Sequence, residues 1–557
     1  MSNDTTKEVT LAANEGIKVN SRYLRGTILE GLSDSSTGAV SGDDNQLLKF
    51  HGSYQQDDRD LRKQRRKEKL EKAFSFMIRV RVPGGVCSSE QYMKMLAISE
   101  KYADGALTFT TRQAFQFHRI LKKDLKLAMK GINEALMTSI AACGDVNRNV
   151  MLNANPHASD LHEEVYQIAL SVQDLLTPKT KAYDEIWMDV KPEQEEAETV
   201  EPLYGKTYLP RKFKVGMAVP PENDIDIYSQ DLGYIAIEEK GKLTGFNVLV
   251  GGGMGMSHGN EKTYARLGSV IGFCTPDQVA SVSENTVAIQ RDFGDRTDRK
   301  HARFKYTIDD KGLDWFVKEL AKRTGFTLEA AKPFEFISSG DAFGWIKGSN
   351  NLWSLTIHSN GGRVGDDTPS LKNGLKSLIE LHQGEIRLTP NKNILLTGIS
   401  DGNKLKMEAV VDEFKIGTID HKSGARLNSI ACVALPTCGL ALSESSRHLP
   451  LFLDDFEAIL NKNGLFNQPI NVRITGCPNG CGRTPLAEIG LVGKAPGKWN
   501  LRLGASHSGD RLNLLYKQAL THEEILAELS PIVKAFADKR EPEEGFGDFC
   551  MREGYVS

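Results

Sequence analysis

The sequence predicts an internally duplicated α+β protein whose two halves pack around a pseudo-two-fold axis. Strand-like stretches that close on paired glycines alternate with helix-like stretches, and this order of elements occurs twice along the chain. The 557 residues suffice for three or four domains, and 40% hydrophobic and 26% charged residues are ordinary for a globular protein. A duplicated β-α-β-α unit packs as two similar halves, and we expect a ligand in the groove between them.

Two pairs of segments carry the repeat in the same order. The first pair is "FMIRVRVPGG" (76–85) and "WSLTIHSNGG" (353–362), each typical of a strand that closes on a glycine turn. A helix-like stretch follows each of them. The second pair is "TTRQAFQFHRI" (110–120) and "TPNKNILLTGI" (389–399). The copies lie 277 residues apart at the glycines and 279 at the threonines, so the spacing is nearly constant.

A glycine-rich stretch supplies a third match and also a misleading motif. "NVLVGGGMG" (247–255) resembles "IGLVGKAPG" (489–497), and we pair the two. The stretch also suggests a dinucleotide-binding loop, but Met256 or His258 takes the place of the third glycine of that fingerprint. We therefore reject a Rossmann site and expect the glycines to let the backbone approach another flat or anionic cofactor.

Four cysteines in two close pairs are the strongest chemical signal. "ACVALPTC" contains Cys432 and Cys438, and "GCPNGCGR" contains Cys477 and Cys481, with 38 residues between the pairs. Four thiolates are what a 4Fe–4S cluster takes, and glycine and proline keep backbone amides near the sulfurs. A zinc site favours two to four residues between paired ligands, which the five between Cys432 and Cys438 exceed. A 4Fe–4S cluster is the main hypothesis; a zinc site and ordinary buried thiols are the alternatives.

The other cysteines have no partner nearby in the sequence, so we expect ordinary buried side chains. They are Cys87, Cys143, Cys274 and Cys550.

Basic residues recur in strand-like contexts. In "YLPRKFKVGM", Lys212 and Lys214 share one face while Arg211 points the other way. Taken singly, such residues are more often surface charges than ligands. Same-face cations between apolar neighbours favour an acidic ligand, since buried like charges otherwise repel. Further candidates are Arg79 in "MIRVRVP", Arg112 in "TTRQAFQFH" and Arg148 in "CGDVNRNV".

The overall charge and the first residues exclude several classes of function. The formal charge of −3 does not indicate a nucleic-acid or anionic-membrane partner. The first twenty residues have no apolar core of a secretory signal, and no apolar run approaches the length of a membrane span. We therefore expect a cytoplasmic protein.

With these motifs in place, the chain resembles the sirohaem-dependent sulfite/nitrite reductase family. The resemblance runs from "FHGSYQQDDRD" (50–60) to "EGFGDF" (544–549). Its most specific parts are "ACVALPTC", "TGCPNGCGR", "NRNV", "YLPRKFK" and "TTRQAFQFH".

The resemblance implies two ferredoxin-like halves and two larger α/β cofactor-binding domains. The implied divisions are an N-terminal arm for electron-donor or subunit docking (1–70), ferredoxin-like half one (71–142), a sirohaem and substrate domain (143–340), ferredoxin-like half two (341–421) and a 4Fe–4S and sirohaem domain (422–557).

The resemblance also implies site residues. The cluster ligands would be Cys432, Cys438, Cys477 and Cys481, with Cys481 also bridging to the sirohaem iron. The substrate-binding cations would be Arg79, Arg148, Lys212 and Lys214. The sirohaem contacts would be Arg112, Gln116, His118 and Asn479. Relatives commonly carry a further arginine where this chain has Thr108, so one carboxylate contact differs here.

The implied activity is the six-electron reduction of sulfite to hydrogen sulfide in assimilatory sulfur metabolism and cysteine biosynthesis. The alternative is assimilatory reduction of nitrite to ammonia with the same cofactors. The sequence carries no flavin or NADPH signature, so another protein must supply electrons. We expect an NADPH-dependent flavoprotein subunit with FAD and FMN, rather than a ferredoxin, and no nucleic-acid or membrane partner.

Overall fold

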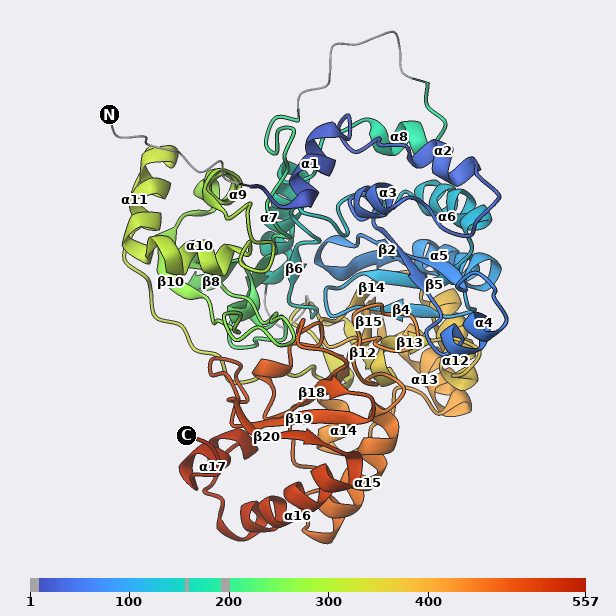
Figure 1. Cartoon of the computed structure of the whole chain (residues 1–557). Coiled ribbons are helices and arrows are strands. Elements are labelled where there is room, and N and C mark those ends of the chain that lie inside the picture. Colours follow the sequence, from blue (N-terminus) through green and yellow to red (C-terminus); the bar gives the residue numbers. More distant parts are fainter. Residues whose placement is uncertain (1–9, 156–159, 192–200) are drawn as a thin grey trace.

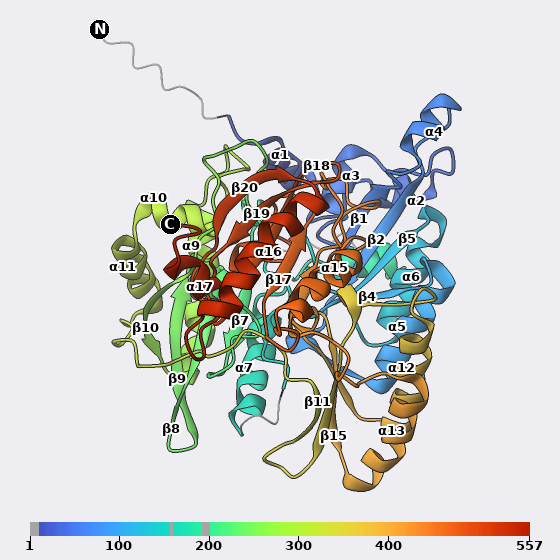
Figure 2. The same cartoon turned by 90° about the horizontal axis from the view of Figure 1, so that it is seen from below.

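Four five-stranded sheets organise the chain in the computed structural model, which describes residues 10–155, 160–191 and 201–557. The sheets form two pairs, and within each pair the strand order is the same. Figures 1 and 2 show the first half of the chain in blue to green and the second half in yellow to red, packed against each other.

The first pair of sheets contains both repeated segments. The first sheet runs β1 (Ser53–Asp57), β2 (Phe74–Val80), β5 (Phe115–Ile120), β4 (Leu107–Phe109) and β13 (Arg363–Val364). The other runs β11 (Gly344–Lys347), β12 (Trp353–Ile357), β15 (Ile394–Ile399), β14 (Glu385–Leu388) and β3 (Val86–Ser88). Residues 76–120 and 353–399 thus have the same strand order, which confirms the predicted duplication.

The two halves exchange one short strand. In the first sheet Arg363 of β13 pairs with Thr108 of β4. In the other sheet Glu385 of β14 pairs with Ser88 of β3. Each half therefore completes the sheet of the other, so the halves are interlocked rather than simply docked.

The second pair of sheets mixes parallel and antiparallel strands. One runs β10 (Ser269–Cys274), β9 (Lys242–Val250), β8 (Leu232–Glu239), β7 (Val215–Ala218) and β6 (Met151–Leu152). The other runs β16 (Ser429–Ala431), β17 (Val472–Thr475), β18 (Ile489–Ala495), β19 (Lys498–Leu503) and β20 (Leu514–Leu520). In each, three neighbouring strands are parallel and the last two are antiparallel hairpin strands.

The pairing of residues 247–255 with 489–497 is wrong. The first segment begins in β9, whereas the second is β18, whose equivalent by strand order is β8. Leu232 pairs with Val250 and Ile489 with Leu503, so β9 corresponds to β19. A valine-rich strand that ends on glycine is too common a pattern to fix the register.

Helices cover the sheets of each half. α5 (Ser89–Tyr102) and α6 (Lys122–Glu134) pack beside the first sheet, and α12 (Pro369–His382) and α13 (Asp401–Phe414) occupy the equivalent place in the second half (Figure 1). α5 begins at a capping box, in which Ser88 accepts from the Gln91 amide while the Gln91 side chain accepts from the Ser88 amide. α7 (Leu161–Leu175) and α9 (Val279–Phe293) lie beside β6–β10, and α15 (Leu449–Lys462) and α16 (His522–Lys539) beside β16–β20.

The structure has further helices besides these. They are α1 (Ala13–Asn20), α2 (Ile28–Ser33), α3 (Gly42–Leu47), α4 (Arg62–Lys67), α8 (Ala182–Trp187), α10 (Phe304–Lys311), α11 (Leu313–Thr324), α14 (Gly424–Leu427) and α17 (Phe546–Arg552). Short 3₁₀ turns include Pro83–Gly85, Ile227–Ser229, Pro276–Gln278, Asn360–Gly362 and Thr484–Leu486.

Part of the expected N-terminal arm belongs to the body of the protein. β1 pairs with β2 along its whole length, and His51 is buried against Trp187, whose indole N–H donates to Nδ1 at 3.0 Å. The charge-rich helix α4 has no buried residue, so it forms a solvated face. Within the described residues, no helix is both long and apolar enough to cross a membrane.

Candidate functional site

The four paired cysteines come together at one edge of the sheet β16–β20. β16 and β17 are adjacent and parallel, so the loops that follow them begin at the same edge. Cys432 follows β16 directly, and Cys477 comes two residues after β17. None of the four is in a disulfide, and Cys481 is the exposed member. Parallel pairing therefore unites two motifs that the sequence keeps 38 residues apart.

The thiols lie within electrostatic range of one another and near backbone amides. Burial, with Cys481 nearby, raises the pKa of Cys432 to about 12 and that of Cys477 to about 11. The Gly476 amide donates to the Cys432 sulfur at 3.3 Å, and amides also reach Cys438 and Cys477. Within the described residues no three His, Cys, Asp or Glu side chains could hold a single metal ion. Four thiols with amide donors match the ligand set of an iron–sulfur cluster.

Two predicted cations precede the parallel strands of the other large sheet. Arg148 lies before β6 and Lys214 directly before β7. A parallel bridge between Asn147 and Phe213 places them side by side. The Arg148 guanidinium donates from Nε and Nη2 to the Gly144 carbonyl, at 3.0 and 2.8 Å. Within the described residues, no hydrogen bond is recorded for its Nη1.

Lys212 and Lys214 are the least compensated cations of the group. Within the described residues, neither ammonium group has a recorded hydrogen bond or ion pair. Burial and neighbouring cations hold the pKa of both well below its usual range. Arg211, in contrast, lies 3.9 Å from the Asp145 carboxylate. The alternation predicted for "RKFK" therefore separates two lysines without a recorded ion pair among the described residues from one guanidinium that has such a pair.

Arg79 is fixed by a row of polar side chains on β2 and β5. Its Nε and Nη2 donate to Gln116 Oε1 at 3.0 and 2.7 Å, and its Nη1 donates to the Cys143 sulfur at 3.1 Å. Gln116 Nε2 lies 2.7 Å from His118 Nε2. Burial and nearby cations lower the pKa of His118 to about 3, so this imidazole is neutral. Of the two residues expected at the cofactor, Gln116 thus contacts Arg79, and His118 contacts Gln116.

Arg112 reaches from the turn before β5 to the large sheet of the same half. It donates to the carbonyl oxygen of Val215 at 2.8 Å and to Gln230 Oε1 at 2.9 Å. Burial lowers its pKa to about 9, so it stays protonated at neutral pH. Thr108 takes the place of the arginine that relatives commonly carry. It lies in β4, where it pairs with Gln116 of β5 on one side and with Arg363 of β13 on the other.

Sequence reasoning missed several cations in this region, among them Arg303, Lys305 and Arg483. Arg303 forms a buried pair with Asp231, with 3.0 Å to each carboxylate oxygen. Lys305 donates to the carbonyl oxygens of Gly253 and Gly255 at 3.1 and 2.9 Å. Burial, followed by the charge of Arg303, lowers the pKa of Lys305 to about 7. The third, Arg483, ends the quoted motif "GCPNGCGR". "ARFK" (302–305) places two cations on either side of a phenylalanine, as "RKFK" does, and this pattern could have pointed to Arg303 and Lys305.

The glycine-rich loop meets the second cysteine loop. The Met256 amide donates to the Pro478 carbonyl at 2.8 Å. A Cβ on Gly255 would lie 3.0 Å from the Asn479 carbonyl oxygen, and one on Gly480 would lie 2.8 Å from the Met254 carbonyl oxygen. Asn479 itself hydrogen-bonds the Cys477 thiol. The expected close backbone approach is therefore made to the other half of the protein.

Cys481 connects the cysteines with the cations. It lies close enough to Arg79, Lys212 and Lys214 to influence the pKa of each. Its carbonyl oxygen accepts from Thr111 Oγ1 at 2.9 Å. The exposed member of the four-thiol centre therefore lies near one guanidinium and two lysine side chains. Fold and site together fit the class of duplicated α+β iron–sulfur oxidoreductases.

Comparison with known proteins agrees with this class. The Nitrite/Sulfite reductase ferredoxin-like half domain matches residues 68–135 and 346–414. The Nitrite and sulphite reductase 4Fe-4S domain matches residues 170–328, which hold most of the sheet β6–β10. The chain belongs to the nitrite and sulfite reductase family.

Two relatives and one solved structure extend the match over nearly the whole chain. The sulfite reductase [NADPH] hemoprotein beta-component of Oceanobacillus iheyensis is 56% identical, covering 97% of this chain and 94% of the relative. The protein of the same name from Shouchella clausii is 52% identical, covering 97% and 95%. The structure of the Mycobacterium tuberculosis NirA protein has a TM-score of 0.79 at 22% identity, covering 98% and 97%, and shows the same fold.

The residues present fit the cofactors of this family. Sirohaem carries carboxylates around its ring, and the buried Nε atoms of Arg112 and Arg303 have no hydrogen-bond partner within the described part of the chain. Such guanidinium groups suit carboxylate ligands. The amide-surrounded thiols fit a 4Fe–4S cluster.

Proposed function

We propose that this protein reduces sulfite to hydrogen sulfide with six electrons, as the hemoprotein component of an assimilatory sulfite reductase that supplies sulfide for cysteine biosynthesis. Its cofactors are a sirohaem and a 4Fe–4S cluster. The names of the relatives, which are 50–56% identical to this chain, favour sulfite over nitrite. The domain divisions given above apply to this proposal, except that His51 and β1 belong to the body rather than to an N-terminal arm. The sirohaem would lie between residues 143–340 and 422–557.

The position of Cys481 is the observation that carries the proposal. A cluster held by Cys432, Cys438, Cys477 and Cys481 would have its exposed ligand facing Arg79, Lys212 and Lys214. We propose that Cys481 also ligates the sirohaem iron. Electrons would then pass from the cluster to the haem through one sulfur. The cofactors supply the redox chemistry, and the chain supplies placement and charge.

The cations would bind and orient the substrate. Sulfite is a dianion, and Arg79, Arg148, Lys212 and Lys214 would neutralise it. Anion binding would favour the charged form of the two lysines, whose pKa is held low in the free protein. Each sulfite oxygen leaves as water, so ammonium groups beside the anion would also donate protons.

Arg112 would hold a sirohaem carboxylate, and Asn479 would support the cluster side of the cofactor. Gln116 and His118 would act at the same edge, next to Arg79. Lys305 and Arg303 join this set through the glycine-rich loop and Asp231.

The test is the absorption spectrum of protein purified from a host that makes sirohaem, followed by steady-state assays with sulfite and nitrite. We expect a sirohaem Soret band, cluster iron and a higher specificity constant for sulfite. A protein with cluster iron but no Soret band would be an electron carrier. A far higher specificity constant for nitrite would make it a nitrite reductase.

We infer that a flavoprotein subunit with FAD and FMN donates the electrons, because the relatives are named as NADPH-dependent components. Turnover with NADPH and the purified flavoprotein, compared with reduced ferredoxin, would decide between the donors. A cytoplasmic location stays a prediction that cell fractionation checks.

A further inference from the structure

The loops after β7 and β17 are equivalent in the two halves. Val215 and Val472, which begin these strands, are 257 residues apart. The 3₁₀ turns that follow begin at Ile227 and Thr484, again 257 residues apart. By this register Asp224 corresponds to Cys481, and Asp226 corresponds to Arg483.

The backbone supports this correspondence. Asp226 and Arg483 both adopt the left-handed conformation, with φ of 49° and 52°. The Asp226 amide donates to the Asn223 carbonyl, and the Arg483 amide to the equivalent Gly480 carbonyl, each at 3.0 Å. The two loops therefore share a backbone course while their side-chain chemistry differs.

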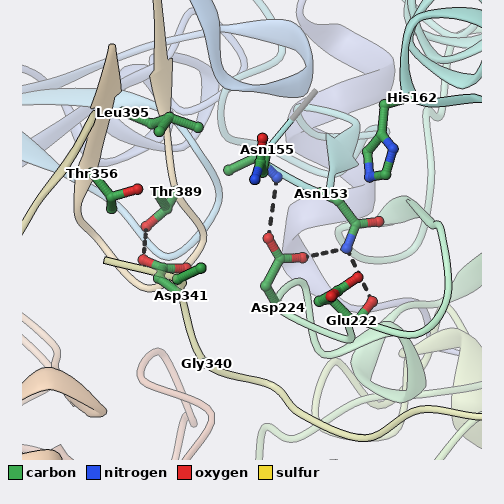
Figure 3. A pocket seen from close by; sticks show the side chains of 12 residues that line it. Asn153, Asn155, His162, Glu222, Asp224, Gly340, Asp341, Thr356, Thr389 and Leu395 are labelled. Atoms are coloured by element: carbon green, nitrogen blue, oxygen red, sulfur yellow. Dashed lines mark hydrogen bonds between the residues drawn. The ribbon is translucent and has the colours of Figure 1, made fainter. Parts of the chain in front are cut away.

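A small pocket marks the difference in chemistry (Figure 3). Asn153, Glu222 and Asp224 line it, and they stand where Cys432, Asn479 and Cys481 stand in the second half. Asn153 Nδ2 donates to Asp224 at 2.6 Å. The first half thus has the Asp224 carboxylate and the Asn153 amide in place of two thiols, and the role of this region differs from that of the cysteine loops.

Asp226 contacts its own equivalent, Arg483. Equivalent residues touch only at the pseudo-two-fold axis, so this pair lies there. The Asp226 carboxylate is fully buried and accepts from Arg483 Nε and from Arg473 Nη1, the latter at 2.6 Å. Opposite charges at one symmetric position make an attractive pair where two identical charges would repel.

From Arg483 the contacts lead to Cys481. Arg483 Nη1 donates to the Thr111 carbonyl at 2.7 Å, and Arg483 Nη2 to the Pro390 carbonyl at 3.2 Å. Thr111 Oγ1 in turn donates to the Cys481 carbonyl at 2.9 Å. The cysteine loop is thereby fixed to a turn of each half.

We propose that Asp226 is a positioning residue for Cys481. It lies in the half that lacks the paired cysteines, and it acts through Arg483 and Thr111 on the backbone of the exposed cysteine. The inference rests on the proposed function, in which Cys481 joins two cofactors. Breaking a buried ion pair leaves an uncompensated charge, so the loop would shift when Asp226 is neutralised.

The experiment compares two pairs of variants of the holoprotein. Asp226→Asn is matched with Glu488→Gln, because Glu488 is also a fully buried carboxylate but hydrogen-bonds Asn471 and Gly547, away from Cys481. Thr111→Ala removes the last hydrogen bond, and Thr111→Ser keeps it. The readouts are the thermal midpoint, iron and sirohaem per chain, the haem absorption bands, the reduction potentials and sulfite turnover.

We expect Asp226→Asn and Thr111→Ala to shift the haem bands or potentials and to lower turnover by about tenfold, because small misplacements at a reacting centre are costly. Glu488→Gln should lose thermal stability alone, and Thr111→Ser should resemble the parent. The inference is overturned if Asp226→Asn only loses stability and Thr111→Ala matches Thr111→Ser.

If Asp226→Asn does not fold, the Thr111 pair decides by the same criteria. A parent protein without sirohaem or sulfite turnover would refute the proposed function instead. The cluster spectrum and potential of the variants would then still test the positioning of Cys481.

Discussion

Gln113 and Lys392 occupy equivalent positions in the two halves and make equivalent contacts. Both are left-handed, with φ of 49° and 72°. Gln113 Nε2 donates to the Leu152 carbonyl at 2.8 Å, and Lys392 Nζ donates to the Ala431 carbonyl at 3.0 Å. The second half makes this contact with a cation beside Cys432, and burial lowers the pKa of Lys392 to about 8.

Replacing Lys392 should separate its hydrogen bond from its charge. Lys392→Met leaves the buried Ala431 carbonyl unpaired and should cost about 1–3 kcal/mol of unfolding free energy, whereas Lys392→Gln, which copies Gln113, should cost about 1 kcal/mol or less. Both should lower the reduction potential of the cluster, since a positive charge is lost. Urea unfolding and redox titration measure these effects. Equal stability loss in the two variants would contradict the hydrogen-bond role.

Lys214→Met should lower sulfite turnover while both cofactor spectra stay normal. A charged hydrogen bond contributes about 1.5–3 kcal/mol, which corresponds to roughly ten- to a hundredfold. Arg211→Met is the matched control, because the Arg211 guanidinium is already paired with the Asp145 carboxylate. It should affect the substrate step less. Parental turnover in Lys214→Met would show that the cation group does not bind sulfite.

Cys481→Ser should reduce sirohaem retention as well as cluster iron, because one sulfur would serve both cofactors. Cys274→Ser is a suitable control, since Cys274 is buried in β10 away from the paired cysteines. Iron analysis and the Soret absorbance of the purified proteins give the two readouts. A Cys481→Ser protein with full content of both cofactors and full activity would rule out the bridge.

His51 should make the protein less stable in acid. Burial lowers the pKa of this imidazole to about 4, and its Nε2 lies 2.9 Å from the Leu24 carbonyl while Nδ1 accepts from Trp187. In the unfolded chain the His51 imidazole takes up a proton near its ordinary pKa, whereas in the folded protein it stays neutral until the pH approaches 4. The contribution of His51 to the free energy of unfolding should therefore fall by about 2 kcal/mol from pH 7 to pH 5.

Urea unfolding at both pH values checks this. His51→Phe, which cannot titrate, should be less stable at pH 7 but show a flatter pH dependence. The same slope in variant and parent would exclude His51 as the cause.

Residues 1–340 and 341–557, expressed separately, should not fold stably. The first fragment lacks β13 and leaves β3 unpaired, and the second lacks β3 and leaves β13 unpaired. Unpaired strand edges and exposed core favour aggregation. Circular dichroism and solubility of the fragments, alone and co-expressed, test this. A cooperative unfolding transition in either fragment alone would show that the exchange is dispensable.

Several features were accessible from the sequence because they are local. Strands that close on glycine turns, such as 76–85 and 353–362, carry their turn chemistry within ten residues, and the duplication followed from them. The cysteine spacing was likewise local. The match of 247–255 with 489–497 failed for the same reason, since a local pattern cannot say which strand of a sheet it occupies.

The sequence by itself determined the duplicated α+β plan, the four paired cysteines and the alternation of Lys212 and Lys214. Only the tertiary structure decided that Cys481 lies near those lysines, that Arg303 and Lys305 join them, and that Asp226 pairs with Arg483. These contacts join residues that are far apart in the chain; Asp226 and Arg483, for example, are separated by 257 residues in the sequence. No local periodicity records such a pairing; it arises when parallel strands, an exchanged strand and a pseudo-two-fold axis bring distant loops to one place.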